Sequence, residues 1–263
     1  MTSIDISFGN LALAYLMLIA PLSIMLWLRL PMISETLIAV LRMTVQLLFV
    51  GFYLQVIFDL DSLPLTALWL LVMLVVADLS IVRGCGLRMR RVALGVFASL
   101  LVGTLIPLLF FIFLIFQDSA ALGAQYVIPI SGMILGNCLR ADIIGIQSFY
   151  EGLRQREKAY LLALAQGATL HEALLPFVRK AFRASMAPTV AAMATIGLVA
   201  LPGMMTGVIL GGGDPMTAIK YQIAIMIAIF AGTALTVILA VRLTAIGNIG
   251  AEGLLRKEIF TAD

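Results

Sequence analysis

The sequence predicts an all-α integral membrane protein that forms one transmembrane domain over residues 1–263. Hydrophobic residues make up 62% of the chain and charged residues only 12%, and the mean hydropathy is +1.12. A soluble domain needs more polar residues than this to cover its core. The charged residues also fall into clusters, separated by apolar stretches that are long enough to cross a bilayer.

Seven apolar stretches predict seven transmembrane helices, because a helix needs about 20 apolar residues to cross the hydrocarbon layer. No basic residue precedes Arg29, so we expect no cleavable signal peptide and expect the first stretch to remain as a helix. The predicted spans are 6–28, 36–58, 64–82, 92–116, 119–139, 184–213 and 221–241.

The basic residues predict an N-terminus outside and a C-terminus inside. With this orientation, 15 of the 17 lysines and arginines lie in inner loops, where such residues gather in membrane proteins. Of the other two, Lys220 is outside and Arg42 lies within the second span. The outer loops are short and acidic, with Asp59, Asp61, Asp118 and Asp214.

Residues 140–183 predict a cytoplasmic helical hairpin between helices five and six. After an extension of the fifth helix, a short amphipathic helix starts at Glu157 and stops at Gly167, which can adopt a left-handed conformation. Thr169 and Glu172 have the spacing of a capping box, which starts a second helix that leads into the sixth span. On this pattern alone, the hairpin is either an ordinary connector or a docking element for a cytosolic partner.

The hairpin resembles the coupling motif of ABC-transporter permeases, in which a short helix inserts into a groove of the ATPase subunit. The motif has an acidic residue, alternating alanines, a glycine and then Leu-Pro, and the matching residues here are Glu157, Ala159, Ala163, Ala165, Gly167 and Leu175-Pro176. The resemblance therefore implies that an ATPase couples to this hairpin. The residues expected to serve that coupling are Glu157, Ala163, Gly167, Thr169, Glu172 and Pro176.

Further segments resemble the FetB-type permeases, the metal- or iron-export ABC permeases of bacteria, which are related to plant aluminium-tolerance permeases. The segments are IPISGMILGN (128–137), RASMAPT (183–189), GLVALPGMMTGVILGGGDP (197–215) and AIKYQI (218–223), and the resemblance covers the chain from about the second helix onward. It implies a multi-pass permease of the bacterial inner membrane that exports a metal ion such as iron. Because plant relatives are linked to sugar nucleotides, export of another small solute is the alternative.

The chain contains no G-x-x-x-x-G-K-[S/T] loop, so we expect it to bind no ATP and no cofactor of its own. ATP-Mg would bind a separate cytosolic ABC ATPase. Since two ATPase subunits close around two nucleotides, a second permease chain is expected in the membrane lipid, as a homodimer or with a close homologue. A channel or secondary transporter is a further alternative, whereas an enzyme would need a catalytic cluster that the sequence does not show.

Polar residues inside the predicted spans are candidates for the translocation pathway. Arg42 and Asp78 lie at similar depth, so we expect them to pair or to share a hydrated site, although Arg42 could instead extend to the inner surface. Gln46 lies one turn from Arg42 and is expected to line the pathway or to bond a neighbouring helix. Asn137 follows two glycines at a spacing that permits close helix packing, so its face is either a packing surface or part of the pathway.

Pro202 and Gly203 predict that the sixth span kinks or breaks near the middle of the membrane, because proline removes a backbone donor. Met204 and Met205 either fill core space or, with Thr206, line the pathway of the dimer. Thioethers suit Cu(I) better than iron, which makes both methionines weak candidates for metal ligands. Cys85 and Cys138 are expected to be inert thiols and His171 a surface residue, so a metal site would have to form between helices or between chains.

Overall fold

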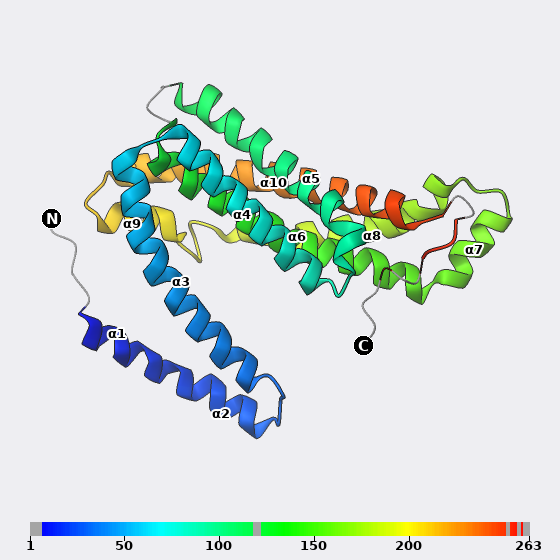
Figure 1. The fold of residues 1–263 in the computed structure, drawn as a ribbon, viewed down its shortest axis with the longest axis horizontal. Coiled ribbons are helices and arrows are strands. Elements are labelled where there is room, and N and C mark those ends of the chain that lie inside the picture. Colours follow the sequence, from blue (N-terminus) through cyan, green and yellow to red (C-terminus); the bar gives the residue numbers. More distant parts are fainter. Residues whose placement is uncertain (1–6, 118–121, 251–252, 257–258, 260–263) are drawn as a thin grey trace.

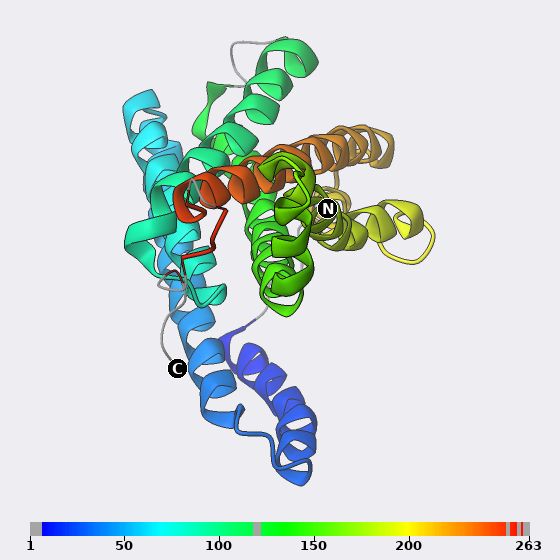
Figure 2. The same cartoon turned by 90° about the vertical axis from the view of Figure 1, so that its right-hand side faces the viewer.

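In a computed structural model, the structure describes residues 7–117, 122–250, 253–256 and 259. Within these ranges the chain is helical, apart from turns and two isolated backbone bridges (Figure 1). The all-α fold is therefore confirmed for the described part of the chain. It divides into a helical body and an N-terminal hairpin that projects from it (Figures 1 and 2).

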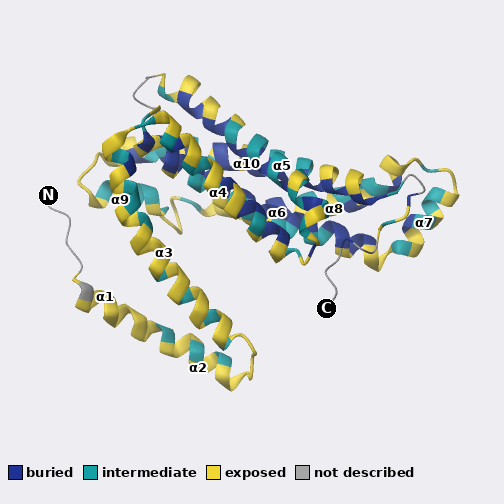
Figure 3. Ribbon diagram, in the orientation of Figure 1, coloured by how far each residue is buried: buried dark blue, intermediate teal, exposed yellow. Residues whose placement is uncertain are grey.

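The N-terminal hairpin has two arms. The first consists of α1 (Phe8–Ala14), η1 (Tyr15–Leu18) and α2 (Ile19–Trp27), and the second is α3 (Ile33–Leu60). A hydroxyl contact of 2.5 Å between Tyr15 and Thr44 joins the arms. Both arms are exposed along most of their length (Figure 3), and Ile57 is the buried residue of α3. Such apolar, exposed helices suit a lipid environment or a further protein surface.

The body is built around α4 (Leu63–Gly84), α5 (Met89–Phe110), α6 (Ala124–Gln155) and α10 (Pro215–Asn248). A short π-helix, η2 (Phe111–Phe116), extends α5. The buried apolar side chains of these helices form one continuous core (Figure 3). The α3 helix joins the body only near its end, where Ile57 packs with Ala124 and Ile128 of α6.

The predicted sixth span, 184–213, is not one helix. The α8 helix (Leu170–Thr195) ends within this span, residues 196–202 form a non-helical link, and α9 (Gly203–Leu210) follows. Leu198 in the link is 92% exposed. A break near Pro202 was expected, but the helix already stops at Thr195, and Pro202 takes the N-cap position of α9.

Six described helices are long and apolar enough to cross a membrane. They match the other six predicted spans, with ends that differ by several residues, and they are Gly9–Trp27, Ile33–Leu60, Leu63–Gly84, Met89–Phe116, Ala124–Gln155 and Pro215–Asn248. The chain is therefore a multi-pass membrane protein. The fifth of these helices continues well beyond 139, so no structural boundary separates the predicted span from the start of the predicted insert 140–183.

The directions of the helices alternate. In Figure 1, α4, α6 and α10 run from left to right, whereas α3, α5 and α8 return from right to left. The α7 helix (Glu157–Ala165) lies at the right-hand end, and α9 lies at the left. The path through α8, the link and α9 therefore leads from the end that carries α7 to the opposite end.

Candidate transport site and coupling element

The structure contains the short helix, the terminating glycine and the capped second helix that the sequence predicts for the hairpin. The α7 helix begins at Glu157, and Gly167 follows it with a φ of +94°, a left-handed conformation that favours glycine. A Cβ on Gly167 would meet no atom within 4 Å, so the backbone angle, and not space, is what requires glycine. Ala163 is half-buried against the core, while Gly167 and Pro176 are exposed.

The predicted capping box at Thr169 is confirmed. The Thr169 hydroxyl accepts a hydrogen bond from the Glu172 backbone N–H at 3.3 Å, and the Glu172 carboxylate accepts one from the Thr169 N–H at 2.8 Å. The Thr169 hydroxyl lies 2.7 Å from the same carboxylate. These hydrogen bonds hold the pKa of Glu172 below its ordinary value. The start of α8 is therefore fixed by its own side chains.

Tyr160 attaches this hairpin to the body. Its hydroxyl donates to the carbonyl of Gly253 at 2.8 Å, and its ring meets the edge of Phe177 on α8. Burial raises the pKa of Tyr160, so the phenol stays a neutral donor. The α7 helix is therefore attached both to α6, which it follows directly, and to α8.

Asp142 is the most deeply buried carboxylate in the described chain. Its side chain is 0% exposed, and the hydroxyl of Thr236 on α10 donates to its Oδ2 at 2.8 Å. Its other oxygen, Oδ1, has no hydrogen-bond partner. A buried carboxylate with one empty acceptor is costly unless a proton, cation or donor reaches it. Among the described residues, this makes Asp142 a candidate transport residue.

A close helix crossing sets the depth of Asp142. At Gly103 of α5, a Cβ would lie 2.7 Å from Cβ of Thr236, and at Gly232 of α10 it would lie 2.6 Å from the Gly103 carbonyl oxygen. Gly103 lies near the middle of the 28-residue span Met89–Phe116. The carboxylate of Asp142 therefore lies at the level of this crossing, while the next residue, Ile143, contacts Gly84 at the end of α4.

The sequence does not single out Asp142, because Arg140 ends the predicted fifth span two residues earlier. The recurrence of buried residues at one-turn intervals could have identified Asp142. Cys138, Asp142, Ile146 and Phe149 recur at one-turn intervals, and all four are buried in the structure. Asp142 is thus a charged residue on the apolar face of a helix that continues past the first cluster of charges.

The predicted pair of Arg42 and Asp78 is not formed within the described chain. Arg42 is exposed on α3, and the buried Oδ1 of Asp78 has no hydrogen-bond partner. The α3 helix reaches α4 through Tyr53, whose ring centroid is 4.4 Å from that of Trp69. Trp69 precedes Asp78 by nine residues, or two and a half turns, so the two side chains leave opposite sides of α4. The rotation of α4 therefore separates Asp78 from the side of α4 that faces α3.

Asn137 lies half-buried on α6, and its amide donates to the carbonyl of Met133 at 2.7 Å. Of the two glycines before it, Gly132 faces Met73 of α4, since a Cβ there would lie 3.3 Å from Cε of Met73. A Cβ on Gly136 would meet nothing within 4 Å. Close packing is therefore found at Gly132 and not at Gly136.

The residues from Pro202 to Thr206 form the start of α9 beside α10. Both the backbone N–H and the hydroxyl of Thr206 donate to the carbonyl of Pro202, at 2.9 and 3.0 Å. Met204 packs against the main core, and Met205 is half-buried. Gly203 is exposed at the first position of the helix. The Thr206 hydroxyl thus donates to the backbone of its own helix, while its lone pairs stay available.

Among the described residues, no three His, Cys, Asp or Glu side chains are grouped closely enough to hold a metal ion. Cys138 is buried, Cys85 is half-buried, and both are free thiols. His171 is exposed at the start of α8, on the rim of an apolar hollow of about 330 Å³ that Arg242 also lines.

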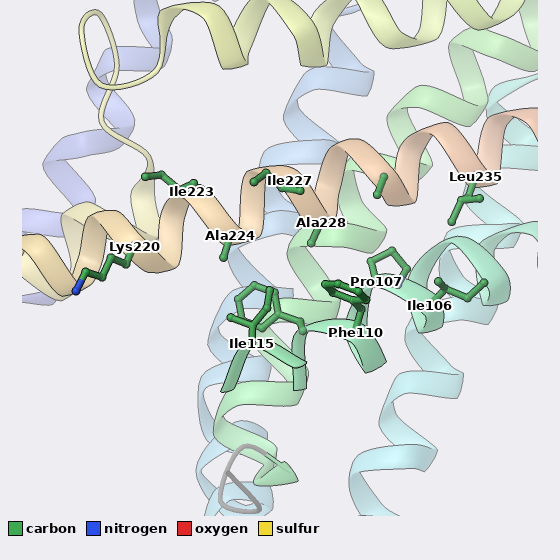
Figure 4. Close-up of a pocket in the computed structure, with 12 residues that line it drawn as sticks. Ile106, Pro107, Phe110, Ile115, Lys220, Ile223, Ala224, Ile227, Ala228 and Leu235 are labelled. Atoms are coloured by element: carbon green, nitrogen blue, oxygen red, sulfur yellow. The ribbon is translucent and has the colours of Figure 1, made fainter. Parts of the chain in front are cut away.

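An apolar cavity of about 600 Å³ opens between α5, η2 and α10 (Figure 4). Apolar side chains such as Phe110, Ile223 and Ile227 line it, and Lys220 lies at one end. Apart from the Lys220 ammonium, which repels cations, its side chains offer no nitrogen, oxygen or sulfur atom. A metal ion would find no ligand there, so this cavity suits hydrocarbon and not a cation.

Comparison with known proteins agrees with the membrane fold. The model of the family described as Uncharacterised protein family (UPF0014) matches residues 8–246. A UPF0014 membrane protein of Synechocystis sp. is 34% identical over 219 residues, which are 83% of this chain and 85% of the relative. No solved structure matches the chain.

Two further relatives have functional names. The probable iron export permease protein FetB of Escherichia coli is 33% identical over 248 residues, 93% of each chain. The protein ALUMINUM SENSITIVE 3 of Arabidopsis thaliana is 33% identical over 196 residues, 73% of this chain and 69% of the relative. The resemblance to FetB-type permeases found in the sequence is thereby confirmed. Since the family model spans nearly the whole chain, this protein belongs to the UPF0014 family of membrane permeases.

Proposed function

We propose that this chain is the membrane-spanning permease subunit of an ATP-driven ABC transporter that exports a metal ion such as iron. A separate cytosolic ATPase binds ATP-Mg, two permease chains form the membrane part, and this chain holds no nucleotide. The assembly lies in the bacterial inner membrane. The metal is proposed because FetB, a relative over 93% of the chain, is named a probable iron export permease.

The observation that carries the proposal is the hairpin of α7 and α8. The α7 helix is short, lies at one end of the body, and joins α6 to α8. The alanines of the hairpin allow close approach of a partner surface, and its glycine turn and capping box give it a fixed shape. These are the properties that an element needs to receive the movement of a docked ATPase.

Charge distribution supports seven crossings with the N-terminus outside. The six long helices and the broken path through α8 and α9 alternate in direction, which gives an odd number of crossings. The end with α7 also carries Arg88, Arg154 and Arg156, whereas Asp61 and Asp214 lie at the other end. Basic residues favour the cytoplasm, so the α7 end is the inner one.

The cargo is proposed to pass the level of Asp142. The free Oδ1 of this buried carboxylate can accept a positive partner, and a hard cation such as iron accepts oxygen ligands. The structure encloses Asp142 completely, so passage requires the helices around it to separate. Movement of α6 and α8 by the hairpin is the proposed cause of that separation.

Two substitutions at Gly167 test the coupling. Gly167→Val should abolish binding of the ABC ATPase and its stimulated ATP hydrolysis, because a β-branched residue rarely adopts a φ of +94°. Gly167→Asn should retain most of both, since asparagine tolerates this conformation. Both variants are compared with the wild-type chain by co-purification of the ATPase and by ATPase assays. Full binding and stimulation with Gly167→Val would remove the hairpin from the coupling mechanism.

A further inference from the structure

One face of α3 carries polar side chains that the described chain leaves uncovered. Gln46 and Arg42 lie one turn apart on this face, and both are exposed. Gln46 is the fourteenth of the 28 residues of α3, which places its amide at the middle of the helix. No described residue forms a hydrogen bond with it. An uncovered carboxamide at this depth is unfavourable in lipid, because hydrocarbon offers no hydrogen-bond partner.

The same face of α3 is the one that turns toward the body. Gln46 precedes Tyr53 by two turns and Ile57 by three, so the three side chains share one side of the helix. Tyr53 packs on Trp69 of α4, and Ile57 is buried against α6. Below these contacts α3 diverges from the body in both views (Figures 1 and 2). Gln46 therefore faces the angle between α3 and the body of its own chain.

We propose that a second copy of this chain fills this angle. The two copies then contact each other through their α3 helices, an arrangement called the clasp below. The carboxamides of the two Gln46 residues meet at the two-fold axis of this dimer. A carboxamide has both donors and an acceptor, so it can pair with its own copy. A two-fold interface demands such a self-complementary group. The inference rests on the proposed function, in which two permease chains form the membrane part.

In this arrangement the angle beside α3 is filled in both copies. When each α3 enters the angle of the other copy, the two α3 helices meet by the faces that look toward their own bodies. These faces carry Gln46 in each copy. Arg42 lies one turn nearer the inner surface, and its long side chain can extend to the headgroups there. Gln46 is too short and too central to do the same, which is why it marks the contact.

Cysteine cross-linking tests the contact directly. In membranes, Gln46→Cys should form a disulfide-linked dimer on mild oxidation, because two cysteines at the axis would have Cα atoms about 4.4–6.8 Å apart. Leu48→Cys is the matched control, since Leu48 lies at the same depth and about 160° around the helix. The parent chain, which keeps Cys85 and Cys138, gives the background. The readout is the dimer band in non-reducing gels.

A strong dimer band from Gln46→Cys, with Leu48→Cys at background, is the expected result. Equal bands from both variants, or no band from Gln46→Cys, would overturn the proposal. As a second measurement, Gln46→Leu should weaken dimerisation at least about tenfold in detergent, and Gln46→Asn should weaken it less. Co-purification of the ATPase is scored on the same samples. A cross-linked chain that binds no ATPase contradicts the proposed function alone, whereas an ATPase-bound chain without the cross-link contradicts the clasp alone.

Discussion

At the scale of single residues, the buried carboxylate of Asp142 dominates the chemistry of the membrane region. It accepts one hydrogen bond, from Thr236, and retains one free oxygen in a fully buried position. A structural carboxylate at this depth would be expected to have all its acceptors filled. The free oxygen is compatible with the proposal that a transported cation visits this carboxylate.

Asp142→Asn should insert and bind the ATPase normally, because asparagine has nearly the same shape and can still accept the Thr236 hydrogen bond. Export of the metal should fall at least about tenfold, as expected when a charged hydrogen-bonding group becomes neutral. Transport and thermal unfolding are measured on the same preparation. Thr236→Val serves as the control that removes the hydrogen bond but keeps the charge. Unchanged export by Asp142→Asn would exclude Asp142 from the pathway.

Glu172 predicts a pH dependence of the hairpin. Its pKa is lowered from the ordinary value of 4.5, mainly by the Thr169 hydroxyl. A lowered pKa in the folded state means that the stabilisation is complete above the ordinary value and is lost as the pH falls through the lower one. Protease resistance of the hairpin should therefore decrease on acidification below about pH 4.5. In Glu172→Gln this pH dependence should be reduced, and an identical profile would contradict the assignment.

At the scale of elements, the crossing of α5 and α10 holds the body together. Gly103 and Gly232 bring the two backbones into direct contact, so neither position has room for a Cβ. Glycine also permits close helix approach in membranes, where dispersion and not the hydrophobic effect drives association. The crossing fixes Thr236 beside Asp142 and thereby joins packing to the candidate transport site.

Gly103→Ala and Gly232→Ala should each lower the free energy of unfolding by about 1–3 kcal/mol, because the added methyl group overlaps atoms 2.6–2.7 Å away. Gly136→Ala should change it by no more than about 0.5 kcal/mol, since that position is open. Thermal or denaturant unfolding in detergent compares the three variants. Equal stability of all three would show that the crossing is looser than described.

The elements also show what the sequence could and could not predict. The lengths of the apolar stretches and the charge clusters between them were sufficient to predict six membrane-spanning helices. The glycine and the capping pattern were sufficient to predict the hairpin of α7 and α8. A break in span 184–213 was expected at Pro202, but α8 already ends at Thr195, because hydropathy does not register where hydrogen bonding stops within an apolar stretch. The pairing of Arg42 with Asp78 was wrong because depth along a helix follows from sequence, whereas rotation toward a neighbour depends on packing. Asp142 was missed because the charge of Arg140 was taken as the membrane boundary.

At the scale of the whole molecule, the alternating helices separate a basic end from an acidic one. Cysteine labelling with a reagent that does not cross membranes tests this topology. Met216→Cys, at the acidic end, should react in intact cells, and Gln166→Cys should react only after permeabilisation, since both positions are exposed. Labelling of both from outside would contradict the proposed orientation.

The most direct test of the account is ATP-dependent metal transport by the complete complex. Inside-out membrane vesicles that contain the chain and its ABC ATPase should accumulate iron when ATP is supplied. Accumulation should stop without ATP and with Gly167→Val, because the hairpin then fails to transmit ATPase closure. Accumulation of iron that does not depend on ATP, or that survives Gly167→Val in full, would contradict the proposal that this chain is an ATP-coupled metal exporter.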